Sequence, residues 1–221
     1  MHIGPLDLPI RLQCIRATAL AVFLSLFPTL TSGQQVNIGV NVPGLSQPAT
    51  AVLEPDVSGA AGPNSYAEFV NGAFGVFSKT AGTITAQSTD QAFWENAGIS
   101  ASTLSSGASN PRLIYDPNSG RWFATEITNN ATANNILLAI STGSDPSPVP
   151  GNWSAVSFAS AASGSAYPYG SFPTLGIDAN GLYIATDNYS GSSAYASSNS
   201  IASLFSISKP ACWQPLRPSQ T

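Results

Sequence analysis

The chain has 221 residues, of which seven are Lys or Arg and 11 are Asp or Glu, so its formal net charge is −4 at pH 7. This acidic balance argues against nucleic acids and anionic membrane surfaces as partners, because both attract basic proteins. The single histidine is His2 and the two cysteines are Cys14 and Cys212, which argues against histidine-based catalysis and against His/Cys metal clusters.

The N-terminus has the pattern of a secretory signal peptide. Arg11 and Arg16 precede an apolar run over residues 17–30, and small residues suit cleavage after Gly33. The run is shorter than the roughly 20 residues of a membrane span. A buried apolar helix is the alternative interpretation. We expect residues 1–33 to be removed and the protein to be secreted, extracellular or periplasmic, with no membrane span after cleavage.

Removal of this segment would take away His2 and Cys14 and leave 188 residues. That length is enough for one domain with a core. The remaining chain would have a single cysteine, Cys212, and therefore no disulfide within itself.

The rest of the chain alternates between short apolar runs and turns. Residues 34–61 are rich in Val, Pro, Gly and Ser, and we interpret them as an extended lead-in segment. Residues 62–208 have the spacing of an antiparallel β domain, and residues 90–99 can supply one short helical turn. Strands are predicted at residues 65–71, 74–79, 113–116, 121–127, 135–142, 153–158, 174–178, 182–189 and 200–208, with another after the TAGTIT stretch at 80–85.

Three predicted hairpin turns share one design, in which an Asp is followed by a Gly and, two residues later, by a large aromatic residue. The Asp side chain accepts backbone N–H bonds at the start of the turn. The Gly supplies a positive φ, and the aromatic residue can pack inward from the returning strand. The three sets are Asp116, Gly120 and Trp122; Asp145, Gly151 and Trp153; and Asp178, Gly181 and Tyr183.

These strands group into units of propeller-blade size. Residues 113–158 hold four strand candidates, as one four-stranded blade does. Residues 65–90 would supply part of a preceding blade and residues 174–208 most of a following one. We therefore predict an all-β fold made of antiparallel four-stranded blades of a partial β-propeller, and a β-sandwich is the alternative.

Residues 209–221 contain Pro210, Pro215 and Pro218, which we expect to exclude a helix. We interpret this stretch as an irregular tail, either natural or produced by truncation or a frame shift.

Several phrases, in order, resemble a family of secreted bacterial β-propeller proteins with BNR/sialidase-like repeats. They are EPDVSGAAGPNSYAEFVNGAFGVFSKTAGTIT (54–85), NPRLIYDPNSGRWFATEI (110–127), LLAISTGSDPSPVPGNWSAVSF (137–158) and FPTLGIDANGLYIATDNY (172–189). The resemblance covers about residues 50–208 and implies a propeller at the cell surface or outside the cell. The chain departs from the family in two ways. Family members are usually longer than this chain. In an Asp-box the Asp and the Gly are two positions apart in the sequence, whereas in these three turns they are four, six and three positions apart. The turns are therefore Asp-box-like.

The sequence offers few catalytic candidates. Sialidase chemistry needs an arginine clamp, usually of three residues, and the chain between the signal and the tail supplies only Arg112 and Arg121. Tyr115 and Glu126 could form a nucleophile pair, and Glu126 and Asp187 could act as the two carboxylates of a glycosidase.

Asp187, Asn188 and Tyr189 group oxygen ligands with an aromatic ring at a strand end. This combination suits a Ca²⁺ ion or a sugar contact, and backbone capping by Asp and Asn is the alternative. Trp122 and Trp153 could likewise form a sugar platform or be core residues.

The leading hypothesis is a secreted, non-catalytic β-propeller-like binding or adhesion module, present here as a partial chain of a longer propeller, whose partner is a carbohydrate or a cell-surface polymer. It needs no cofactor, although Ca²⁺ is possible. The alternatives are a secreted glycoside hydrolase of sialidase-like architecture and a non-functional fragment with exposed sheet edges.

Overall fold

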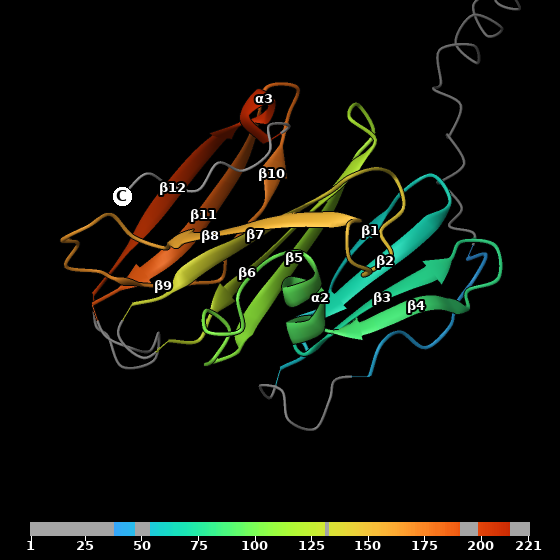
Figure 1. Ribbon diagram of the computed structural model, residues 1–221, viewed down its shortest axis with the longest axis horizontal. Helices are drawn as coiled ribbons and strands as arrows, with labels where there is room; N and C mark the ends of the chain where they lie inside the picture. Colours follow the sequence, from blue (N-terminus) through green and yellow to red (C-terminus); the bar gives the residue numbers. More distant parts are fainter. Residues whose placement is uncertain (1–37, 47–53, 131–132, 191–198, 213–221) are drawn as a thin grey trace, which may run out of the picture. The chain divides into compact units, whose positions relative to one another are not determined.

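The computed structural model describes residues 38–46, 54–130, 133–190 and 199–212 (Figure 1). The chain divides into two compact units, Met1–Gly39 and Val40–Thr221, and every described strand and helix belongs to the second unit. The predicted signal peptide and the tail from residue 213 onward lie outside the described residues.

The second unit contains three four-stranded antiparallel sheets, which confirms the all-β prediction. Sheet A consists of β1 (Ser58–Ala61), β2 (Ser65–Val70), β3 (Ala73–Ser78) and β4 (Ile84–Thr89). Sheet B consists of β5 (Ala108–Asp116), β6 (Arg121–Thr128), β7 (Asn135–Ser141) and β8 (Trp153–Ala159). In both sheets the strands pair in chain order. Sheet C consists of β9 (Tyr169–Ser171), β10 (Gly176–Ile177), β11 (Gly181–Tyr189) and β12 (Ser200–Ser208), and both β9 and β10 pair with β11.

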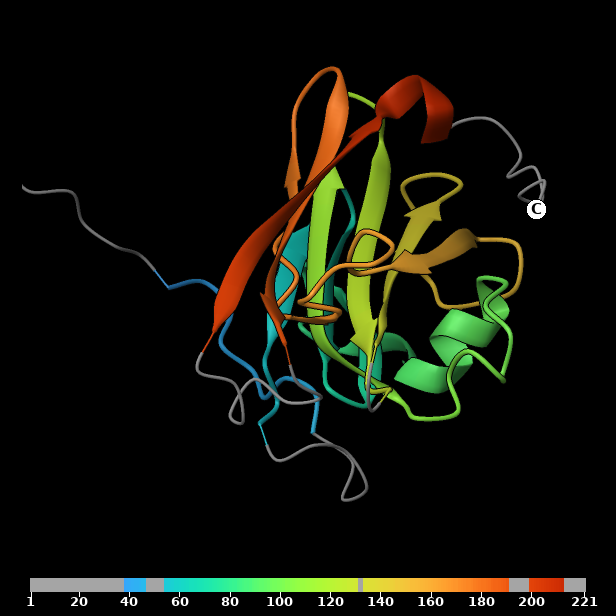
Figure 2. The ribbon, with the colours of Figure 1, turned by 90° about the vertical axis from the view of Figure 1, so that its left-hand side faces the viewer.

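Sheet B lies between the other two sheets, and its two central strands, β6 and β7, are buried on both faces. Along β6 the side chains alternate: Trp122 and Ala124 join the apolar cluster shared with sheet A, and Phe123 and Ile127 join the cluster shared with sheet C. Figure 2 shows sheet C, in orange and red, lying across the green and yellow strands of sheet B. This two-sided burial explains the nearly continuous apolar runs of β6 and β7.

The helix α2 (Asp90–Asn96) is longer than the single turn predicted from the sequence. The side chain of Thr89 caps it by accepting the backbone N–H of Ala92 at 3.1 Å, and Asp90 lies in the first turn, where a negative charge is favourable. Phe93 and Trp94 are fully buried in the cluster between sheets A and B.

Two features of the structure differ in detail from the interpretation of the sequence. The lead-in segment contains a strand, β1, because Gly59, Ala60 and their neighbours pair with β2 over four residues. The prolines do not exclude helix throughout the tail, since α3 covers Lys209–Cys212. Pro210 is tolerated there because the first turn of a helix needs no N–H donor.

The acidic residues of the three turns accept backbone N–H bonds as the sequence predicts. Asp116 accepts from Ser119 at 3.1 Å, Asp145 from Ser147 at 3.0 Å and Asp178 from Gly181 at 2.8 Å.

The glycines of these turns differ. Gly120 and Gly151 have φ values of 67° and 88°. The positive φ expected at Gly181 is absent, because this residue already begins the extended β11. A Cβ at this position would be in tight contact with the backbone, 3.1 Å from the carbonyl oxygen of Ile207.

The aromatic residues after these turns also differ. Trp122 and Trp153 are buried, and their ring N–H groups donate to the carbonyls of Ser144 and Pro146. This makes both of them core residues. Tyr183 is half-buried, and its hydroxyl donates to Asp178 at 3.1 Å.

Candidate functional site

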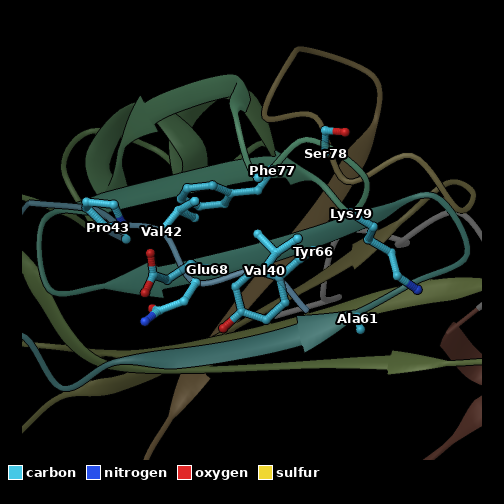
Figure 3. A pocket seen from close by; sticks show the side chains of 12 residues that line it. Val40, Val42, Pro43, Ala61, Tyr66, Glu68, Phe77, Ser78 and Lys79 are labelled. Carbon is cyan, nitrogen blue, oxygen red and sulfur yellow. The ribbon is translucent and has the colours of Figure 1, made fainter. Parts of the chain in front are cut away.

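A pocket of about 430 Å³ lies on the face of sheet A that points away from sheet B (Figure 3). One side is formed by residues 40–45, which we call the strap, and the other by side chains of β2 and β3. This volume lies within the usual range for small-ligand sites. The lining residues are Val40, Asn41, Val42, Pro43, Gly44, Ala61, Tyr66, Glu68, Phe77, Ser78, Lys79 and Gly82.

The strap is held to the sheet by one carboxylate and one apolar contact. Glu68 accepts the backbone N–H of Leu45 at 2.6 Å. A Cβ on Gly44 would lie 2.6 Å from this carboxylate, so a larger residue there would push the Glu68 side chain aside. The side chain of Leu45 lies over Gly75 of β3, where a Cβ would come within 2.6 Å of it. Two small residues therefore let the strap close over the sheet.

The side of the pocket formed by the sheet is aromatic. The ring centroids of Tyr66 and Phe77 are 6.1 Å apart, and Tyr66 is 38% exposed. Gly59 makes room for Tyr66, because a Cβ at that position would collide with the phenol hydroxyl. In Figure 3, Val40 is drawn next to Tyr66 and Val42 next to Phe77.

Polar groups complete the lining. Burial raises the pKa of Tyr66, and the nearby charge of Glu68 raises it further, so the phenol is a neutral hydrogen-bond donor at physiological pH. Lys79 uses its ammonium group to bind the carbonyl of Gly62 at 2.9 Å. The pocket thus combines an exposed aromatic ring, a carboxylate acceptor and hydroxyl donors.

Sequence reasoning did not single out this pocket. The signal that could have indicated it is the set of glycines opposite large side chains, with Gly59 next to the strand of Tyr66 and Gly75 beneath Leu45. To recognise this pattern of glycines one must know which residues of β1, β2 and β3 lie opposite one another, and that register cannot be derived from the sequence.

The structure does not bring Asp187, Asn188 and Tyr189 into one cluster. They alternate along β11: Asp187 is exposed, whereas Asn188 is fully buried. The Asn188 amide donates to the carbonyls of Ser160 and Tyr167 and accepts from the Thr186 hydroxyl. Asn188 therefore serves as an internal hydrogen-bond hub between the strands and a loop.

The two carboxylates considered for glycosidase chemistry are also apart. Glu126 is fully buried on the side of β6 that faces α2, and its Oε2 accepts the ring N–H of Trp94 at 2.5 Å. Asp187 is exposed on sheet C.

The remaining catalytic candidates are held in structural contacts. The ring of Tyr115 packs on the ring of Trp122, with their centroids 4.9 Å apart. Arg112 pairs with Asp56 at 3.1 Å, and Arg121 binds the carbonyl of Ser141.

No family model matches the chain, and no curated protein matches it.

Within the part of the chain that the structure describes, no group of three or more His, Cys, Asp or Glu residues could hold a metal ion. In that same part, no helix has the length and apolar character needed to cross a membrane.

Glu126 is expected to make stability depend on pH. Burial raises its pKa well above the ordinary value, and the charge of Asp90 adds to this effect, so the folded protein keeps the carboxyl protonated where the unfolded chain ionises it. The contribution of Glu126 is complete below the unfolded pKa and is lost as pH rises toward the folded pKa, at about 1.4 kcal/mol per pH unit. Glu126→Gln keeps an oxygen acceptor for Trp94 and removes this loss.

Denaturant unfolding between about pH 4.5 and 7 checks this expectation. The free energy of unfolding of Glu126→Gln should rise relative to that of the wild type as pH increases. Glu95→Gln, on the exposed side of α2, is the matched control and should follow the wild-type profile. Parallel profiles for Glu126→Gln and the wild type would contradict the assignment.

Proposed function

We propose that this protein is a secreted, non-catalytic binding module of β-propeller type, and that the strap pocket holds the ring of a carbohydrate. The observation that carries the proposal is the pocket itself, where the exposed ring of Tyr66 lies beside the Glu68 carboxylate. An aromatic face packs against the C–H face of a sugar ring, and a carboxylate accepts hydrogen bonds from sugar hydroxyls.

The arrangement of the sheets supports the propeller part of the proposal. Three four-stranded antiparallel sheets follow one another along the chain, and each packs face to face on the next. The first strands of sheets A and B also lie together, since the backbone N–H of Leu113 in β5 donates to the hydroxyl of Ser58 in β1 at 3.0 Å. Corresponding strands of successive blades meet in this way around a propeller axis.

The placement of the acidic residues supports a non-catalytic role. A two-carboxylate glycosidase needs both groups at the scissile bond, with one on each side. Glu126 is closed off from solvent and is hydrogen-bonded to Trp94.

Binding of a panel of neutral oligosaccharides, measured by isothermal titration calorimetry, tests the proposed site. Tyr66→Ala is expected to weaken binding about ten-fold, which corresponds to about 1.4 kcal/mol, because the pocket loses its exposed ring. Tyr189→Ala is the matched control: it removes a tyrosine from sheet C, where the sequence alone placed the ligand. It should leave the affinity unchanged.

Other outcomes would overturn the proposal. Loss of binding in Tyr189→Ala alone would move the site to sheet C. Release of shortened oligosaccharides that stops in Asp187→Asn would favour the glycosidase. Absence of binding across the panel would remove carbohydrate as the ligand class.

A further inference from the structure

The strand β12 forms one edge of sheet C. It pairs with β11 in an unbroken antiparallel register over all nine residues, from Ser200 to Ser208. Figure 1 shows it, in dark red, on the far side of β11 from β10. Among the described residues, no strand pairs with its other edge. Across sheets A and B, four strands lie in succession and end at β4 and β8, whereas in sheet C β9 and β10 share one edge of β11, so β12 is only the third position across the sheet.

This edge lacks the features that usually protect edge strands from pairing. Its sequence, SIASLFSIS, contains no charged residue and no proline, and its register with β11 has no bulge. The opposite edge of sheet C is formed by β9 and β10, with only three and two residues. Long, uncharged, regular edges recruit further strands, because their outward N–H and C=O groups can complete a hydrogen-bond ladder.

The strand is complementary to itself in the antiparallel direction. Pairing two copies about Leu204 places Ile201 opposite Ile207, Ala202 opposite Ser206 and Ser203 opposite Phe205, with Leu204 opposite its own copy. The side chains of each opposed pair lie on the same face of the joint sheet. Leu204 is 74% exposed and Ile201 is 44% exposed, so both gain apolar contacts in this pairing.

The strand β12 brings no charged side chain of its own to such a pairing. Lys209, which follows it, has its ammonium group buried against Asp116 at 2.7 Å. The exposed Asp187 lies on β11, opposite Ala202, and is therefore one strand away from the edge.

We propose that β12 is a self-association edge, through which two copies of the chain join their C sheets into one continuous antiparallel sheet around a two-fold axis. The interface is isologous: each copy donates and accepts the same backbone hydrogen bonds, and the two Leu204 side chains meet at the axis. This inference depends on the geometry of sheet C alone and is independent of the proposed ligand.

Charge substitutions at position 204 test the inference, with analytical ultracentrifugation of the full chain across a concentration series. The wild type is expected to form a dimer that dissociates on dilution. Leu204→Lys and Leu204→Glu should each weaken the dimer at least ten-fold, because like charges would face each other across the axis. An equimolar mixture of the two variants should dimerise again, because lysine then faces glutamate.

Ile84→Lys is the matched control, since Ile84 is 48% exposed at the start of β4. It should dimerise as the wild type does. A wild type that stays monomeric at all concentrations would overturn the proposal. So would a dimer that survives Leu204→Lys, or assembly that grows beyond two copies. Circular dichroism of each variant confirms that its sheets are intact.

Discussion

Lys209→Met is expected to lower the free energy of unfolding by about 3–5 kcal/mol, because it leaves a buried carboxylate without its partner. The ammonium group of Lys209 lies 2.7 Å from Asp116, and the two side chains are only 5% and 4% exposed. Asp116 also accepts from the hydroxyl and backbone N–H of Ser119. The ion pair thus joins α3, at the end of sheet C, to the β5–β6 turn of sheet B.

The effect should depend on pH in a direction that identifies the ion pair. Burial alone would raise the pKa of Asp116, but the hydrogen bonds from Lys209 and Ser119 outweigh it and the net pKa is lowered. Ionised Asp116 therefore stabilises the wild type above the unfolded pKa of about 3.9, and this contribution is lost as pH falls through the folded pKa. The difference between the wild type and Lys209→Met should shrink on acidification.

Chemical denaturation of matched variants measures the effect. Arg112→Met breaks the more exposed pair with Asp56 and should cost about 1 kcal/mol or less. The double variant Lys209→Met, Asp116→Asn should recover part of the loss, because no uncompensated charge remains. Equal losses for Lys209→Met and Arg112→Met would contradict the role assigned to the buried pair.

Phe93→Ala is expected to destabilise the fold by about 3–5 kcal/mol, as deletion of a buried aromatic ring usually does. Phe93 is 1% exposed and lies at the centre of an aromatic cluster. Its ring stacks on Phe74 at a centroid distance of 4.7 Å and meets the edges of Phe69, Trp94 and Trp153 at 5.0–5.1 Å. The cavity would therefore open where α2, sheet A and sheet B meet.

Phe172→Ala is the control for ring deletion, since Phe172 is 44% exposed. It should change the free energy of unfolding by about 1 kcal/mol or less. Thermal and denaturant melts of the two variants give the comparison. A loss below about 1 kcal/mol for Phe93→Ala would mean that the helix is not part of the cooperative core.

The sequence predicted the strands well because local patterns govern them. Apolar runs bounded by Gly, Asn and Asp located most strands, and the four strands predicted within residues 113–158 are those of sheet B, whose first strand starts earlier, at Ala108. Gly120 and Gly151 adopt positive φ because tight turns require it. Where the pattern was weak the prediction failed: β1 consists of Ser, Gly and Ala alone and has no apolar alternation to detect.

The site could not be predicted because its parts meet through long-range contacts. Glu68 binds the strap 23 residues away, and Glu126 meets Trp94 across 32 residues. Asp187 and Asn188 do not lie together, because strand alternation directs neighbouring side chains to opposite faces. Asn188 is fully buried and uses its amide to hydrogen-bond the backbone carbonyl of Ser160 inside the protein.

The contact between Asp116 and Lys209 also bears on the order in which the chain can fold. The two residues are 93 positions apart. Because synthesis starts at the N-terminus, Asp116 is made long before Lys209. Sheets A and B are meanders of neighbouring strands and can assemble from local contacts, which form early. The Asp116 carboxylate in the β5–β6 turn, however, gains its ion-pair partner only after Lys209 has been synthesised and has packed against it. We therefore expect the buried carboxylate of sheet B to be neutralised only once α3 has docked on the β5–β6 turn.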